Sequence, residues 1–271
     1  MSARFKRGVR QAAGAAFFIA LLLCGETGLA QTGLAQGRRL VDLELVLAVD
    51  TSSSVSPGEF NLQMQGLAEA FRNSAVHGAL QAAGDLGIAV AMVQWSDNRK
   101  QTVAIDWKMV RDRNSAVAFA REIDATPRYL IGGGTAIGGA VNFSAHHLRI
   151  NGFEGRRKVI DVSGDGRTNQ GSNPARARDD AVAQGITING LAILNEDGLV
   201  DRHYLANVIG GTGSFVMQAD DYSDFARAIV EKLIKEIAGV PIAGLPPGDH
   251  PGGPSSNPGP QQAARMDRGT D

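Results

Sequence analysis

The feature that most constrains the fold is a near-continuous apolar run, LELVLAV, at residues 43–49. A strand with one face in water alternates apolar and polar residues, whereas an unbroken apolar run is typical of a strand covered on both faces. Such strands occur in parallel sheets that carry helices on either side. The run therefore predicts a buried strand near the centre of a layered α/β fold.

Strand and helix patterns alternate along the rest of the chain. Ser56, Pro57 and Glu59 predict a capping box, which starts a helix soon after the first strand. The other expected strands are 86–95, 101–107, 158–163, 186–194 and 214–219, and the other expected helices are 112–125, 135–148, one capped by Asn173-Pro174 and one opening at Asp221. This alternation predicts an α/β, Rossmann-like three-layer sandwich, in which a mostly parallel sheet has helices on both faces.

The start of the chain has the features of a secretory signal peptide. Residues 1–30 combine a basic beginning with the apolar stretch 12–24, and both Ala30 and Ala35 suit cleavage. The stretch is short for a membrane span, which needs about 20 residues; a retained anchor is the alternative. We expect a periplasmic or secreted protein with no stable membrane span after cleavage.

Two further segments flank a single expected domain at residues 39–239. Residues 31–38 form a short linker, and residues 240–271, rich in proline, glycine and serine, form an expected disordered tail. Loss of residues 1–30 removes four basic residues and Glu26, which moves the formal net charge from −1 to −4. A mildly acidic exported chain without a basic run is a poor nucleic-acid binder, so we expect no nucleic-acid partner.

Polar side chains directly follow the first expected strand. Asp50, Ser52 and Ser54 alternate in DTSSS, so all three can point to one side of an extended loop. A carboxylate with two hydroxyls is a hard-oxygen set that suits Mg²⁺ or Mn²⁺ better than zinc. Thr135, behind three glycines, and Asp165, between two glycines, are further candidates. Ligands of such sheets bind at the carboxyl ends of strands, so we expect a metal site there.

These five residues, in this order, resemble the metal-ion-dependent adhesion site (MIDAS) of the von Willebrand factor type A (VWA) domain, over roughly residues 41–239. The resemblance implies that Asp50, Ser52, Ser54 and Thr135 hold Mg²⁺ (or Mn²⁺), while Asp165 acts through water. With Asp165 bound only through water, the direct ligands carry little negative charge. The resemblance therefore implies that the ion also binds the carboxylate of an Asp or Glu from a partner protein. The chain also looks like an exported bacterial branch of this superfamily.

One detail departs from the usual VWA pattern. Gly164 stands between Ser163 and Asp165, so we expect Asp165 to lie one residue further from the strand end than in VWA relatives. Asp161 lies inside the same strand and is expected to be paired within the fold.

A second loop is expected on the same edge of the sheet. Asn195, Glu196 and Asp197 follow another expected strand. A role in partner selection at the rim of the metal site competes here with an ordinary surface loop.

Each residue of the expected site also has an ordinary structural explanation. Asp50 suits a turn, Ser52 or Ser54 a helix start, Thr135 an N-cap, and Asp165 a tight turn. Two other functions compete with adhesion: a metal-dependent hydrolase of phosphoesters or peptides, and a VWA-like scaffold without metal. The chain has no GxSxG, HExxH, GxGxxG or GxxxxGK motif, so we expect neither an enzyme nor a nucleotide-binding protein.

Overall fold

The computed structural model describes residues 37–239 and contains one sheet of six strands in the order β3-β2-β1-β4-β5-β6. The strands are β1 (Arg39–Asp50), β2 (Ile88–Trp95), β3 (Gln101–Val110), β4 (Phe153–Gly164), β5 (Ile186–Ile193) and β6 (Val216–Ala219). Neighbouring strands are parallel except for β3, which runs antiparallel to β2 at one edge. The prediction of a mostly parallel sheet is confirmed.

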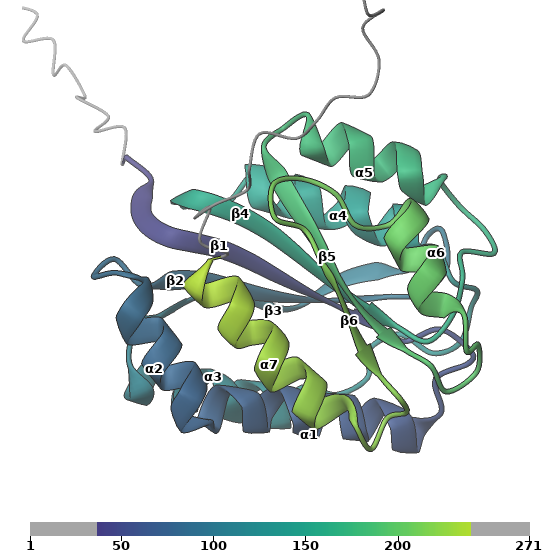
Figure 1. Cartoon of the computed structure of the whole chain (residues 1–271), viewed down its shortest axis with the longest axis horizontal. Helices are drawn as coiled ribbons and strands as arrows, with labels where there is room; N and C mark the ends of the chain where they lie inside the picture. The colour runs from purple at the N-terminus through teal and green to yellow at the C-terminus, as the bar shows by residue number, and fades with distance from the viewer. Residues whose placement is uncertain (1–36, 240–271) are drawn as a thin grey trace, which may run out of the picture. The chain divides into compact units, whose positions relative to one another are not determined.

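Helices cover both faces of this sheet (Figure 1). One face carries α1 (Pro57–Arg72), α2 (Ser74–Ala83), α3 (Arg113–Ala125) and α7 (Phe225–Ala238), and the other carries α4 (Ile137–Arg149), α5 (Pro174–Val182) and α6 (Val200–Asn207). The domain is therefore the expected Rossmann-like three-layer sandwich.

The apolar run of β1 is explained by its central position. Leu43, Leu45 and Leu47 pack into the core beneath α1, α3 and α7, whereas Val46 and Ala48 pack into the core beneath α4 and α6. Successive side chains of a strand point to opposite faces. Both sets are buried because each face of β1 has its own layer of helices.

The predicted helix start at Ser56 is confirmed, and two other predicted starts are wrong. The Ser56 hydroxyl accepts a hydrogen bond from the Glu59 N–H (3.2 Å), and the Glu59 carboxylate accepts one from the Ser56 N–H (2.8 Å). Helix α4 begins after Thr135, which is not its N-cap. Helix α7 begins at Phe225, because Asp221 accepts backbone N–H groups in a turn that precedes it.

Helices α2 and α6 were not expected from the sequence. Each is short, and α6 buries only two of its residues, Val200 and Tyr204. Two buried positions give α6 no recognisable helical period, whereas Val76, Ala79 and Leu80 of α2 do stand at helical spacing.

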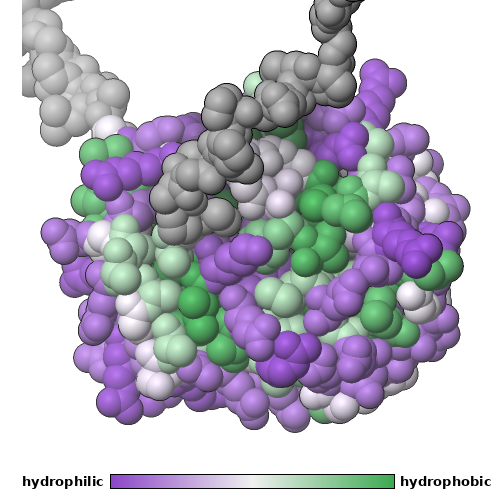
Figure 2. Space-filling model, in the orientation of Figure 1, coloured by the Kyte–Doolittle hydropathy of each residue, from purple (hydrophilic) through white to green (hydrophobic). Residues whose placement is uncertain are grey.

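Several expectations concern residues outside the described part of the chain. The signal peptide (1–30), most of the linker (31–38) and the tail (240–271) lie there. Within residues 37–239, no helix has both the length and the apolar character needed to cross a membrane. Figure 2 shows a largely hydrophilic face on which apolar residues form small groups.

Candidate metal centre

The expected site lies where the winding of the sheet reverses. From the carboxyl end of β1 the chain passes through α1 and α2 to β2, whereas from β4 it passes through α5, on the opposite face, to β5. The crevice between the ends of β1 and β4 is therefore the switch point at which doubly wound sheets bind ligands. Asp50 ends β1 and Asp165 directly follows β4.

Asp50 is fully buried, and within residues 37–239 only one of its carboxylate oxygens has a hydrogen-bond partner. Oδ1 accepts the N–H of Ser52 at 2.7 Å, as in an ordinary turn, but Oδ2 has no partner in this part of the chain. Burial, followed by the negative charge of Asp165, raises the pKa of Asp50 to about 8. A turn alone does not account for a buried carboxylate oxygen left without a partner.

Ser52, Ser54 and Asp165 form a short chain of contacts beside Asp50. The hydroxyl oxygens of Ser52 and Ser54 lie 3.1 Å apart, and the Ser54 hydroxyl donates to Asp165 Oδ1 at 2.8 Å. The other Asp165 oxygen accepts a hydrogen bond from the Tyr222 hydroxyl at 2.9 Å. Asp165 therefore contacts the DTSSS loop directly, although Gly164 separates Asp165 from Ser163.

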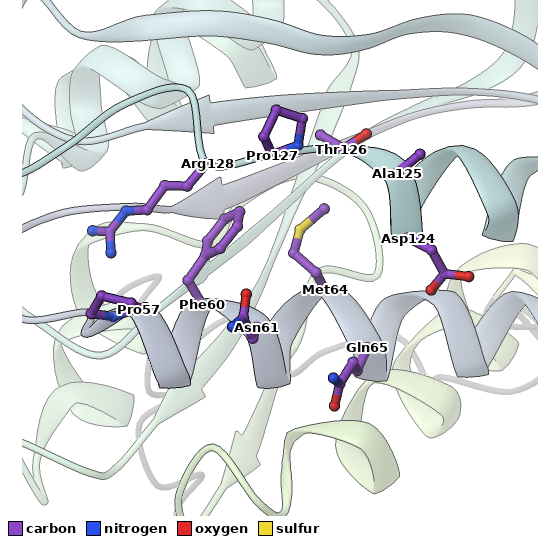
Figure 3. Close-up of a pocket in the computed structure, with 10 residues that line it drawn as sticks. All are labelled: Pro57, Phe60, Asn61, Met64, Gln65, Asp124, Ala125, Thr126, Pro127 and Arg128. Atoms are coloured by element: carbon purple, nitrogen blue, oxygen red, sulfur yellow. The ribbon is translucent and has the colours of Figure 1, made fainter.

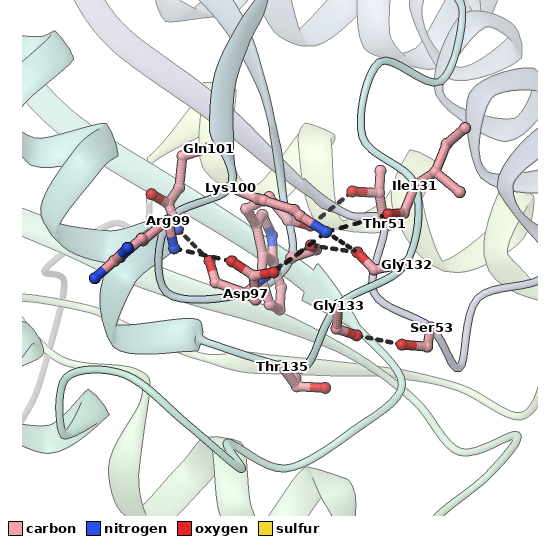
Figure 4. A network of polar contacts seen from close by, with 12 residues as sticks. Thr51, Ser53, Asp97, Arg99, Lys100, Gln101, Ile131, Gly132, Gly133 and Thr135 are labelled. Carbon is pink, nitrogen blue, oxygen red and sulfur yellow. Dashed lines mark hydrogen bonds and ion pairs between the residues drawn. The ribbon is translucent and has the colours of Figure 1, made fainter.

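Thr135 lies on a glycine-rich loop that contacts the DTSSS loop at Ser53 (Figure 4). Ser53 donates its N–H to the Gly133 carbonyl at 3.0 Å, and Gly133 adopts φ +110°, which a residue with a side chain rarely adopts. A Cβ added to Gly166 would lie 3.6 Å from Thr135 Oγ1. Among the hydrogen bonds of residues 37–239, none uses the Thr135 hydroxyl, so this hydroxyl is available beside the aspartates.

The turn between β2 and β3 holds the glycine loop from its other side. Lys100 Nζ donates to the carbonyls of Ile131 (3.3 Å) and Gly132 (3.4 Å), and the Ser96 hydroxyl donates to Gly132 at 2.8 Å. The glycine loop that carries Thr135 is thus held both by the DTSSS loop and by the turn between β2 and β3.

Arg128 connects the glycine loop to the DTSSS loop. Its guanidinium donates to the carbonyls of Thr51 (2.8 Å), Ser52 (3.0 Å) and Val55 (2.8 Å). It also lies 5.7 Å from the centre of the Phe60 ring, at one end of a cavity of about 540 Å³ between α1 and the segment after α3 (Figure 3). One cation therefore holds the carbonyls of the loop that carries both serines.

The residue at position 164 must be small because two buried oxygens crowd it. A Cβ there would lie 2.8 Å from Asp50 Oδ2 and 2.7 Å from the Tyr204 hydroxyl oxygen. Both distances are closer than ordinary contact. The departure from the usual VWA pattern therefore preserves space next to the unpartnered oxygen of Asp50.

We expect Gly164→Ala to destabilise the fold by about 1–3 kcal/mol, because the methyl group overpacks the crevice. The matched control is Gly166→Ala, whose Cβ would meet only ordinary contacts and should change stability by less than about 0.5 kcal/mol. Urea unfolding of both variants measures the difference. Equal stability of the two variants would contradict this account of Gly164.

The residues at the crevice suit a hard divalent cation. Asp50, Ser52, Ser54, Thr135 and Asp165 offer only carboxylate and hydroxyl oxygens, and the unpartnered Asp50 Oδ2 lies among them. Oxygen sets of this kind bind Mg²⁺ and Mn²⁺. Within residues 37–239, no three or more His, Cys, Asp or Glu side chains lie together as a possible metal site.

The expected rim residues have different roles. Asn195 donates to the Glu59 carboxylate at 2.9 Å, and Asp197 pairs with Arg167 at 2.5 Å. The Arg167 guanidinium lowers the pKa of Asp197. Asn195 and Asp197 thus fix the loop to α1 and to the segment after Asp165, while Glu196 remains exposed.

Three residues at the site were not identified from the sequence: Arg128, Tyr204 and Tyr222. Each comes from a segment that carries no metal-site motif, and each reaches the crevice through a tertiary contact. No local pattern in the sequence marks them.

Solved structures with a similar fold include proximal thread matrix protein 1 (PTMP1) from the mussel byssus (18% identity, TM-score 0.55) and the pilus adhesin SpaC from Lactobacillus rhamnosus GG (14%, 0.53). These matches cover 74% of this chain, 49% of PTMP1 and 31% of SpaC. Another structure is PTMP1 with a zinc-occupied MIDAS motif (17% identity, TM-score 0.51, 74% of this chain and 49% of that one). The chain thus spans about half of PTMP1 and a third of SpaC.

Likeness at these identities concerns the fold alone. The sheet order, the two layers of helices and the order of the residues at the switch point define a VWA-like domain. The chain belongs to the family described as "Protein of unknown function (DUF1194)", which matches residues 40–241. No curated protein matches the chain by sequence.

Proposed function

We propose that this protein is an exported, metal-dependent protein-binding module. The observation that carries the proposal is the buried, unpartnered Oδ2 of Asp50 beside a second carboxylate and a row of hydroxyls. Two carboxylates this close repel each other when both are ionised, and a divalent cation between them removes the repulsion. Asp50, Ser52, Ser54, Thr135 and Asp165 would hold that cation.

A cation held by so few charges would act as a Lewis acid with affinity for one more carboxylate. The protein supplies the rest of the binding surface. Tyr129 and Ile131 lie on the loop that leads to Thr135 and are 55% and 80% exposed, and Ile131 points away from the polar network in Figure 4. Exposed apolar side chains beside a polar site are typical of interaction surfaces. We infer a partner that presents an Asp or Glu next to apolar residues.

Binding without turnover is the role that we propose, and the hydrolase remains the alternative. A phosphoester assay with and without Mg²⁺ separates the two. Turnover that disappears in Asp50→Ala would favour the hydrolase.

The first test is metal binding by the purified chain. We expect one Mn²⁺ per chain in an electron paramagnetic resonance titration, with competition by Mg²⁺; Zn²⁺ is included because PTMP1 holds zinc in its MIDAS motif. An Mn²⁺ signal that stays equal to that of the free ion would favour the scaffold without metal.

The second test asks whether the partner binds through a carboxylate. Panning a random peptide library on the chain in Mg²⁺ and eluting with chelator should enrich peptides with Asp or Glu. Replacing that residue by Asn or Gln should weaken binding by at least about tenfold, since a carboxylate on a cation is worth more than a neutral hydrogen bond. Peptides that bind equally well in chelator would contradict a metal-bridged contact.

A further inference from the structure

Tyr204 is a fully buried residue of α6 whose hydroxyl has no hydrogen-bond partner among residues 37–239. A buried hydroxyl without a partner costs about 1–3 kcal/mol. Native proteins rarely carry this cost unless a bound water or ion supplies the missing partner. The hydroxyl of Tyr204 therefore needs an explanation.

Packing explains the ring of Tyr204 but not its hydroxyl. A Cβ on Gly190 would lie 2.5 Å from the ring atom Cδ1, so a glycine in β5 makes room for the ring. Gly190 pairs with Val162, two residues before Gly164. A phenylalanine would fill the same ring space without burying an unpartnered oxygen.

The Tyr204 hydroxyl and Asp50 Oδ2 both lie against Gly164. A Cβ on Gly164 would lie 2.7 Å from the hydroxyl oxygen and 2.8 Å from Oδ2. Because 2.7 Å and 2.8 Å are measured from one point, the two oxygens lie at most 5.5 Å apart. Both are buried, neither has a partner among residues 37–239, and one water or ion can bridge two oxygens at such a separation.

Asp165, by contrast, needs no such guest to satisfy its oxygens. Ser54 donates to its Oδ1 and Tyr222 donates to its Oδ2. The oxygens at the crevice that lack a partner are therefore Asp50 Oδ2 and the Tyr204 hydroxyl, which both lie against Gly164.

We propose that Tyr204 is a sixth residue of the metal centre, and that its hydroxyl and Asp50 Oδ2 together bind a hard divalent cation with its water shell. The inference rests on the proposed metal-dependent function and adds a residue outside the five-residue motif. Tyr204 acts as a positioning residue: its hydroxyl donates toward the carboxylate or the water beside it. The crowding at Gly164 by both oxygens leaves no room for a side chain there.

The test is Tyr204→Phe in the full chain, with Leu205→Ala as the control on an exposed residue of the same helix. We expect the Mn²⁺ dissociation constant to rise at least about tenfold in Tyr204→Phe, as for other residues that orient metal ligands, and to stay unchanged in Leu205→Ala. In chelator, Tyr204→Phe should unfold at the same temperature as the unaltered chain or a higher one, because the variant loses an unpartnered buried hydroxyl.

A spectroscopic measurement tests whether the hydroxyl itself responds to the metal. Adding Mg²⁺ should change the near-ultraviolet tyrosine spectrum of the unaltered chain, and Tyr204→Phe should lose most of that change. A merely structural role predicts the opposite pattern, with lower stability in chelator and an unchanged metal affinity.

The outcomes separate this inference from the function on which it rests. Undiminished Mn²⁺ binding by Tyr204→Phe would overturn the role of Tyr204 and leave the metal centre standing. Failure of the unaltered chain to bind Mn²⁺ would overturn the metal centre and the role of Tyr204 with it.

Discussion

Replacing Asp50 by Asn should abolish the stabilisation of the protein by divalent cations. A ligand that binds only the folded state stabilises it by about 2.7 kcal/mol when its free concentration is 100 times the dissociation constant. The unaltered chain should gain this amount in Mg²⁺ or Mn²⁺. Asp50→Asn should gain almost nothing, because it loses the carboxylate whose Oδ2 has no partner within the described chain.

The same variant should fold normally in chelator. Asp50 is buried close to Asp165, and a neutral amide of the same shape removes the repulsion between the two carboxylates. Thermal unfolding with and without metal measures both effects. Asp85→Asn is the control, since Asp85 is exposed and precedes β2 at the opposite end of the sheet. An equal metal shift in Asp50→Asn and the unaltered chain would contradict the proposed centre.

Replacing Lys232 by Met should destabilise the fold by about 3–5 kcal/mol, because the change leaves buried carboxylates without their cation. Lys232 is fully buried on α7, and its Nζ lies 2.6 Å from Asp161 and 2.5 Å from Glu236. Asn189 of β5 donates to Glu236 at 2.9 Å. The expected pairing of Asp161 within the fold is confirmed.

The loss in Lys232→Met should be smaller at pH 5 than at pH 8. Burial, then the charge of Asp161, raises the pKa of Glu236, while the cations of Lys232 and Arg157 face the same group. A carboxyl group whose pKa is higher in the folded state than in the unfolded state favours folding at low pH and loses that contribution as pH rises. Without Lys232 this effect becomes larger, so the penalty should grow with pH.

Urea unfolding at both pH values measures this prediction. Lys235→Met is the matched control, because Lys235 is exposed on the same helix and its Nζ lies over the Phe215 ring, at 3.9 Å from its centre. That contact is worth about 0.5–1 kcal/mol. Similar losses in the two variants would show that the buried cluster has no special role in stability.

Much of the candidate metal centre could be predicted because its residues stand at strand ends. Asp50 and Asp165 each follow an apolar strand, and parallel strands bring their carboxyl ends to one edge of a sheet. Ser54 contacts Asp165 directly although Gly164 separates Asp165 from Ser163. The crowding of Gly164 by Asp50 and Tyr204 is a tertiary contact that no local pattern shows.

Two other features that the sequence did not predict, the start of α4 and the buried Lys232, also depend on tertiary contacts. Thr135 has the right chemistry for an N-cap, but the glycine loop holds it one residue before the cap of α4. Lys232 lies among apolar residues spaced for a buried helix face, and sequence periodicity does not identify a buried cation whose partners, Asp161 and Glu236, lie on β4 and α7.

By itself the sequence determined the layered fold, the helix start at Ser56 and the order of the candidate ligands, because these follow from local periodicity and from short-range hydrogen bonds. Only the tertiary structure decided which remote side chains reach the crevice. Arg128, Tyr204 and Tyr222 contact it from three separate segments, and such contacts depend on how helices pack across a sheet, which no local pattern encodes.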